Sequence, residues 1–242
     1  MIRLATFNLN MINAIKFDNN QFDFVKIFQK YFDEDISRLH KKYTFERAFS
    51  NQAGGTEEFE LVSNTYSDVI KTPIFKKLWI NFINEVVKPF FDNRSIYIQK
   101  LPSFRIFPSL HSVQYVQKIT DGYNKHLDGE PPYYHPIFET NFWIPLTECD
   151  HLNDFYYQDE KTEDWYRRAD IRMNEMLVFS SNVIHGNRVH NESPNTRCSL
   201  DFKALAVDDY IEDMLTDQQV LKRGKKFKHR DWYSTEHYYM EM

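Results

Sequence analysis

The feature that most constrains the fold of this chain is a change in residue pattern close to Arg94. Before it, for example in the segment 22–39, apolar residues recur at helical spacing with charged residues between them. After it, short segments rich in aromatic and β-branched residues are separated by turn-forming residues. The pattern predicts a mainly helical part over residues 1–94, a β-rich core over residues 95–207, and a helical, charged tail over residues 208–242.

The β-rich part contains several strand-like segments in direct succession, which is typical of antiparallel sheets rather than of alternating βαβ units. We therefore predict an α+β protein, mainly β with flanking helices, that forms a single domain over residues 1–242. Its core is expected to be a jelly roll of two packed sheets, with the N-terminal helices around it. The predicted strands cover residues 96–98, 104–107, 113–119, 137–146, 176–179 and 199–207.

Two positions in the helical part carry helix-boundary signals. Thr72 followed by Pro73 is typical of an N-cap and a first helical residue, so a helix is expected to begin there. Pro89 lacks the backbone N–H that a continuing helix needs, and it should end or kink this helix.

Composition narrows the class of protein. A hydrophobic fraction of 42% and an aromatic fraction of 17% suffice for a packed core, and the net charge of −5 gives no general attraction to nucleic acid or to anionic membranes. No stretch approaches the roughly 18 apolar residues that cross a bilayer. The two cysteines match no zinc spacing, and the N-terminus lacks the pattern of a secretion signal, so a cytoplasmic location is expected. The basic stretch 222–230 could contact nucleic acid or a phosphorylated substrate, but the acidic residues before it favour a charge-paired surface.

The most informative stretch is HLDGEPPYYHP, which begins at His126. Side chains alternate along a strand, so His126 and Asp128 point to the same side, where an imidazole nitrogen and a carboxylate oxygen can hold one metal ion. His185 is the candidate third ligand, because it follows an apolar strand-like run and precedes Gly186, which allows the backbone to turn. Two histidines and one carboxylate form the facial arrangement of non-haem iron(II) oxygenases, which leaves coordination positions open.

A possible anion site follows in the sequence RCSLDFK, which begins at Arg197. Arg197 and Ser199 share one face of the predicted strand. A guanidinium group there suits a bidentate contact with a carboxylate, and the Ser199 hydroxyl group is a further donor.

The order His-x-Asp, then His at a strand end, then Arg-x-Ser resembles the iron(II)- and 2-oxoglutarate-dependent dioxygenase superfamily, whose core is a cupin-like double-stranded β-helix. Further matches are Tyr134-His135-Pro136 and the run ETNFWIPLT over residues 139–147. They are similar to the branch with hydroxylases of streptomycin-type antibiotic biosynthesis, and more distantly to phytanoyl-CoA hydroxylases. The resemblance covers about residues 101–207 and leaves out the N-terminal helices and the tail.

The resemblance implies a role for each matching residue. His126, Asp128 and His185 match the iron ligands, and Arg197, helped by Ser199, matches the residue that pairs with the distal carboxylate of 2-oxoglutarate. Asn141 matches a strand position that often contacts this co-substrate, although a simple cross-strand hydrogen bond explains it equally well. The implied reaction consumes O2 and 2-oxoglutarate, oxidises a C–H bond of a small molecule, and releases succinate and carbon dioxide. The halogenating members have a small residue at the position of the carboxylate ligand, so the aspartate favours hydroxylation or desaturation.

Several alternatives stay open at this point. His190 competes with His185 but lacks the following glycine, and His135 as a fourth ligand would close a position that the reaction needs. The glycine usual in the turn before the strand of the distal histidine is replaced by residues 174–175, which puts the turn type in doubt. A cupin-like enzyme that does not use 2-oxoglutarate and a non-catalytic jelly-roll binding module are the rival functions. The oligomeric state is not predicted.

The substrate contacts are the least specific part of the prediction. Tyr134, Trp143 and Arg105 are the candidates, with the long segment 149–172 as a possible lid over the site. Arg105 or Arg188 would be the next candidate for the 2-oxoglutarate contact after Arg197.

Overall fold

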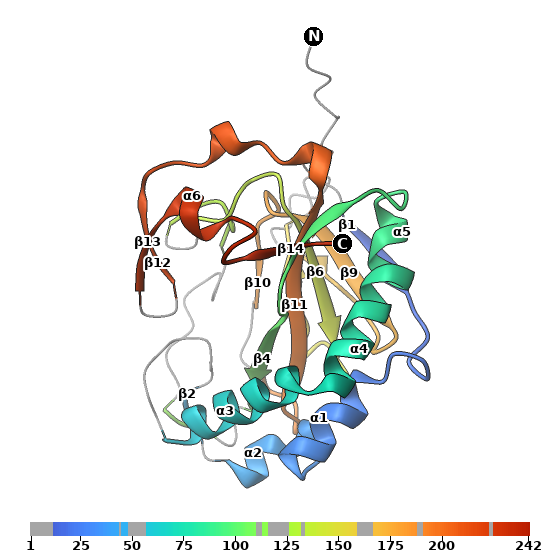
Figure 1. Ribbon diagram of the computed structural model, residues 1–242. Helices are drawn as coiled ribbons and strands as arrows, with labels where there is room; N and C mark the ends of the chain where they lie inside the picture. Colours follow the sequence, from blue (N-terminus) through green and yellow to red (C-terminus); the bar gives the residue numbers. More distant parts are fainter. Residues whose placement is uncertain are drawn as a thin grey trace.

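The computed structural model describes residues 12–43, 45–47, 57–109, 113–115, 126–131, 134–158, 167–187, 191–222 and 225–242. These residues form a mostly antiparallel sheet with helices packed against it, which confirms the predicted α+β class. Figure 1 shows the N-terminal helices gathered on one side of the sheet and the segment with β12, β13 and α6 on another. His190, Arg188 and the end of the predicted strand 113–119 lie outside the described residues.

The main sheet has the strand order β1-β9-β6-β11-β3-β14, and β4 also pairs with β11. The long strand β11 organises it, because β6 pairs along one of its edges and β4 followed by β3 along the other. All of these pairings are antiparallel. The strands are β1 (Ile12–Lys16), β3 (Ile96–Gln99), β4 (Ser103–Phe107), β6 (Thr140–Pro145), β9 (Glu175–Ser180), β11 (Arg197–Ala206) and β14 (Tyr239–Glu241).

The two faces of this sheet differ in chemistry because side chains alternate along each strand. On β11, the even-numbered residues from Cys198 to Ala206 belong to the main hydrophobic core. The odd-numbered residues point to the other face, and they include Arg197, Ser199 and Lys203. The sheet therefore has one face for the core and one face for polar chemistry.

Helices cover the core face. Aromatic rings make much of this contact, as where Phe28 of α1 stacks on Phe104 of β4 at 4.7 Å between centroids, and Trp79 of α4 meets Phe202 of β11 edge-on at 4.8 Å. The helical elements are α1 (Phe24–Phe32), η1 (Ile36–Arg38), α2 (Leu39–Lys42), α3 (Glu57–Lys71), α4 (Pro73–Phe82), η2 (Ile83–Val87) and α5 (Lys88–Phe90).

The helix boundaries agree with the residues that signal them. Thr72 caps α4, since its side chain accepts a hydrogen bond from the Phe75 N–H at 3.2 Å, and Pro73 is the first helical residue. Ahead of Pro89 the helix widens into the π-helical turn η2, and it ends at Phe90. A proline cannot donate to the preceding turn and crowds its carbonyl, so the wider turn accommodates it.

The polar face is covered at one end by a second sheet of order β10-β7-β8, built from β7 (Tyr156–Tyr157), β8 (Arg167–Arg168) and β10 (His185–Gly186). At the other end it is covered by the C-terminal segment. That segment contains η4 (Val207–Asp209), η5 (Glu212–Met214), β12 (Gln219–Lys222), β13 (Lys225–Lys228) and α6 (His229–Trp232) before β14. A small parallel pair, β2 (Phe45–Arg47) with β5 (Val113–Tyr115), lies apart from these sheets.

Two segments differ from the prediction. The described N-terminal part is mainly helical, and β1 adds an edge strand beside β9. The C-terminal tail is mainly strand, since β12 and β13 form a hairpin and β14 joins the main sheet beside β3. The predicted strand 137–146 begins only at Thr140, after a turn at 137–138. Among the described residues, no helix is long and apolar enough to cross a membrane.

Candidate metal centre

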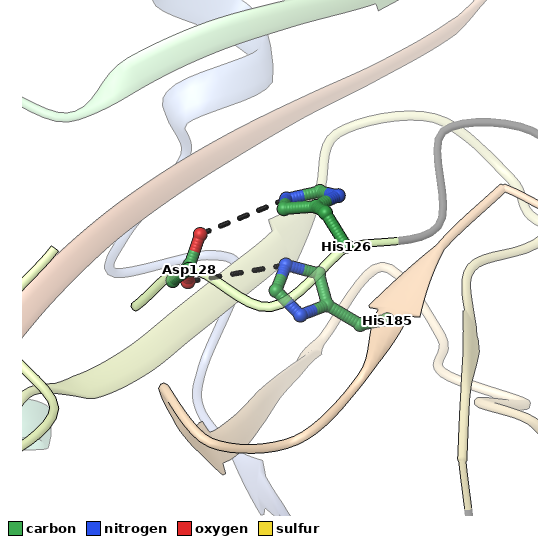
Figure 2. A group of neighbouring side chains, drawn as sticks. All are labelled: His126, Asp128 and His185. Carbon is green, nitrogen blue, oxygen red and sulfur yellow. Dashed lines mark ion pairs between the residues drawn. The ribbon is translucent and has the colours of Figure 1, made fainter. Parts of the chain in front are cut away.

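Three side chains converge on the polar face of the sheet: His126, Asp128 and His185 (Figure 2). One ligand atom from each lies within 4.8 Å of the other two. Nε2 of His126 lies 3.6 Å from Oδ1 of Asp128, and Nε2 of His185 lies 3.9 Å from Oδ2. Two imidazole nitrogens and a carboxylate at this spacing can hold one metal ion.

Backbone pairing brings the two histidines together. The His126 N–H donates to the His185 carbonyl at 3.0 Å, and the His185 N–H donates to the His126 carbonyl at 3.1 Å. Directly opposite residues of an antiparallel pair share a face, and the two rings accordingly lie 4.3 Å apart between centroids. Gly186 follows with φ 153°, a conformation that residues with a Cβ rarely adopt.

The His185 ring is fixed in the orientation and protonation state that a metal ligand needs. Its Nδ1 lies 2.9 Å from the Val183 carbonyl, which can only accept, so Nδ1 carries the proton and Nε2 presents its lone pair to the centre. Phe155 stacks on this ring at 5.5 Å and Phe179 packs against it edge-on at 4.8 Å. Burial lowers the pKa of His185 to about 4, which outweighs the opposing effect of Asp128, so the imidazole is neutral at neutral pH.

The Asp128 carboxylate is ionised and held by two donors. Burial alone would raise its pKa, but the ammonium group of Lys203, followed by nearby histidines, lowers the pKa of Asp128 well below its ordinary value. Lys203 Nζ lies 3.0 Å from Oδ2, and Nδ2 of Asn141 donates to the same oxygen at 2.7 Å. The Asn141 amide therefore contacts the carboxylate ligand. Sequence reasoning missed Lys203, although its even spacing from Arg197 and Ser199 on one strand would have placed it on the same face.

Arg197 is buried at the start of β11 with part of its hydrogen-bonding capacity unused. Nη1 donates to the Asn153 carbonyl at 2.7 Å, and the guanidinium group lies 4.7 Å from the centroid of the Phe107 ring. Among the described residues, Arg197 Nε and Ser199 Oγ have no hydrogen-bond partner, and no carboxylate forms an ion pair with Arg197. The Asp154 carboxylate acts on the Arg197 charge from beyond ion-pair distance, and because a buried donor without a partner is costly, the unused N–H leaves this corner able to bind a carboxylate.

A continuous run of rings joins this corner to the metal ligands. The Arg197 guanidinium group lies 5.7 Å from the Trp143 ring, Trp143 stacks on Phe155 at 5.1 Å, and Phe155 stacks on His185. Trp143 is thus buried beside the anion corner. The described parts of the predicted lid, 149–158 and 167–172, supply Phe155 and two strands of the second sheet, so they form a wall of the site.

The two other substrate candidates lie elsewhere on the polar face. Arg105 forms a bidentate ion pair with Asp201, with distances of 2.5 Å and 3.0 Å, so it is not free for the role of Arg197. Tyr134 has φ 51°, and its carbonyl lies 2.9 Å from Nε2 of His229. It packs against a hydrophobic cluster that includes Trp232, Tyr233 and Tyr238 of the C-terminal segment. In the basic stretch, Arg230 pairs with Asp217 at 3.0 Å, in line with a charge-paired surface.

A second titratable cluster lies beside the centre, between the loop after Asp128 and the C-terminal segment. Glu139 is buried, accepts a short hydrogen bond from the Tyr239 hydroxyl group, and contacts Nδ1 of His135 at 3.1 Å. The backbone N–H of His135 donates to the backbone carbonyl of Asp128 at 2.8 Å. His135 is not among the three side chains whose ligand atoms converge in the described part of the chain. Burial raises the pKa of Glu139 to about 8, although Lys203 and the Tyr239 hydrogen bond oppose the shift.

The raised pKa of Glu139 predicts a specific pH dependence of stability. Between pH 4.5 and about 8, Glu139 keeps its proton in the folded protein but releases it in the unfolded chain. The stability that the protonated Glu139 contributes is therefore fully present below pH 4.5 and is lost as the pH rises to about 8. Relative to Glu139→Gln, the wild-type free energy of unfolding should fall by ~1.4 kcal/mol per pH unit across this window. Urea unfolding at several pH values measures the difference, in which the other titrating groups cancel. Parallel stability curves for the two proteins would show that Glu139 is ionised in the fold.

A centre of two histidines and one carboxylate on an antiparallel sheet is the ligand set of non-haem iron(II) enzymes. No protein-family model matches the chain. The streptomycin biosynthesis protein StrG of Streptomyces griseus is 25% identical over 169 residues, which cover 69% of this chain and 71% of StrG. This similarity confirms the predicted resemblance to proteins of streptomycin-type biosynthesis.

Among solved structures, the chain is similar to HygX from Streptomyces hygroscopicus, whose crystal structure has nickel and 2-oxoglutarate bound, at 12% identity. The match covers 83% of this chain and 85% of HygX with a TM-score of 0.42.

Proposed function

We propose that this chain is an iron(II)- and 2-oxoglutarate-dependent oxygenase that hydroxylates a small molecule and releases succinate and carbon dioxide. The observation that carries the proposal is the combination of the three-ligand cluster with a buried arginine on the same face of the sheet. The similarity to StrG supports a biosynthetic small molecule as the substrate. The proposed unit is a single domain over residues 1–242 with a jelly-roll core, which the second sheet on the polar face supports.

The residues present fit an iron(II) ion. His126, Asp128 and His185 would hold it, with His185 neutral and its Nε2 lone pair directed to the centre. The Asp128 carboxylate is ionised before any metal binds, so the donor set needs no proton release from this residue.

The residues also fit 2-oxoglutarate. Arg197 and Ser199 would hold its distal carboxylate, because Arg197 Nε and Ser199 Oγ are buried and have no partner among the described residues. When bound, iron and 2-oxoglutarate together supply the activation of O2 and the oxidation of the substrate C–H bond. The protein's part is to fix both ligands and to exclude water, and the rings of Trp143, Phe155 and Phe179 around the centre serve the second task.

The Asp128 side chain favours hydroxylation over halogenation. Asp128 would hold the iron at a position that a halide ligand would otherwise need, so the chemistry that the group supplies would be hydroxylation. Tyr134, Trp143 and Arg105 stay the proposed substrate contacts. Both cysteines are free, which supports a cytoplasmic location.

The experiment that tests the function is a screen for succinate formation. The anaerobically reconstituted protein should release succinate slowly from 2-oxoglutarate and O2, and the true substrate should accelerate this release. The product should gain one oxygen atom from labelled O2, and chloride should leave its identity unchanged. Metal binding without any turnover of 2-oxoglutarate would favour a cupin-like enzyme or a non-catalytic binding module, and a chlorinated product would refute hydroxylation.

A further inference from the structure

Lys203 is the charged side chain in closest contact with the carboxylate ligand. It lies in the middle of β11, and its side chain is 9% exposed. Its Nζ lies 3.0 Å from Oδ2 of Asp128 and 2.5 Å from Oδ1 of Asn141. Asn141 Nδ2 completes the triangle with its own hydrogen bond to Oδ2 of Asp128 at 2.7 Å.

This triangle is built into the sheet. Lys203 and Asn141 are directly opposite residues of β11 and β6, so they share a face and reach the same point above it. Each oxygen of Asp128 faces one histidine, Oδ1 with His126 Nε2 at 3.6 Å and Oδ2 with His185 Nε2 at 3.9 Å, but both described hydrogen bonds to this side chain end on Oδ2. The two oxygens of one carboxylate are thereby made different by their surroundings.

The difference decides how many coordination positions the carboxylate can occupy. A carboxylate binds a metal ion through one oxygen or through both. At Oδ2, two donors already occupy the lone pairs, and the positive charge of Lys203 repels a second cation. Oδ1 has neither obstacle.

We propose that Lys203, together with Asn141, keeps Asp128 a one-oxygen ligand and so preserves an open coordination position at the metal. Lys203 is therefore a positioning residue. Its importance rests on the proposed function, since a chelating 2-oxoglutarate and O2 together need every position that the three ligands leave. A carboxylate bound through both oxygens would remove one of them.

Water proton relaxivity of the manganese(II)-loaded protein tests this, because it reports coordinated water without any turnover. The variant Lys203→Met removes the donor and the charge at similar length. The matched control Lys222→Met removes a lysine whose charge interacts with Asp128 but which donates no hydrogen bond to it among the described contacts. We expect Lys203→Met to lose about one third of the inner-sphere relaxivity, one of about three open positions. The control should match the wild type, and manganese affinity in Lys203→Met should be unchanged or tighter.

A second variant and a second ligand make the outcome decisive. Asn141→Leu removes the other donor and should shift relaxivity in the same direction, which keeps the test open if Lys203→Met does not fold. 2-Oxoglutarate should bind at least about tenfold more weakly to metal-loaded Lys203→Met than to the wild type or the control. Wild-type relaxivity in both variants, or equal losses in Lys203→Met and Lys222→Met, would overturn the proposal. If 2-oxoglutarate does not bind even to the wild type, the proposed function fails, while the relaxivity comparison still decides the role of Lys203.

Discussion

His126→Ala, Asp128→Ala and His185→Ala are each expected to weaken iron(II) binding by more than about 100-fold, because loss of even an outer partner of a metal ligand costs 10–100-fold. The three ligand atoms lie within 4.8 Å of one another, so each side chain supplies a third of the protein donor set. Anaerobic titration with iron(II), followed by metal analysis after desalting, measures the affinity and the stoichiometry. The wild type should retain one ion per chain.

His151→Ala is the matched control for the histidine variants, since His151 is exposed and lies outside the cluster. It should bind iron(II) like the wild type. Thermal unfolding of the metal-free proteins separates lost ligation from lost folding. Asp128→Asn is a milder companion to the alanine variant because it keeps the hydrogen-bonding shape but removes the charge. Undiminished binding in both His126→Ala and Asp128→Ala would disprove the ligand assignment.

Arg197→Ala should weaken 2-oxoglutarate binding by about ten- to a hundredfold while leaving iron(II) affinity nearly unchanged. The reason is the loss of a charge-assisted pair in a buried corner, worth roughly 1.5–3 kcal/mol. The weak visible band that 2-oxoglutarate gives on chelating iron(II) follows this binding under anaerobic conditions. Arg197→Lys keeps the charge but loses the planar fork, so its affinity should lie between those of the wild type and the alanine variant.

Arg105→Ala is the discriminating partner of this experiment. Arg105 is already paired with Asp201 through two hydrogen bonds, so its removal should leave 2-oxoglutarate affinity close to that of the wild type. Arg197 also donates to the Asn153 carbonyl, and metal-free stability must therefore be compared alongside affinity. Equal 2-oxoglutarate affinity in the wild type and Arg197→Ala would move the role to another cation.

The local sequence pattern determined not only the fold class but also several positions within it. The spacing of two residues lets His126 and Asp128 reach one metal ion, although only His126 pairs as in a strand and Asp128 lies in a turn, and strand alternation puts Arg197 and Ser199 on one side of β11. Thr72 and Pro73 mark the start of α4 because capping and a fixed φ act within a single turn. These features depend on residues close together in the chain, and such interactions can be derived from residue order.

Long-range pairing decided what the sequence left open. The sequence predicts a helical, charged tail, yet β14 pairs with β3 at the edge of the main sheet. An edge strand offers backbone hydrogen-bond partners that no local sequence pattern reveals. Lys203 meets Asp128, and Glu139 meets Tyr239, across large separations in the chain. A lysine or glutamate is ordinarily exposed, and only its burial against a particular partner sets its charge and contacts. The sequence by itself therefore determined the ligand types and their spacing along the chain, and the tertiary structure decided how they converge and which buried charges surround them, because burial and partner choice are properties of the packed chain.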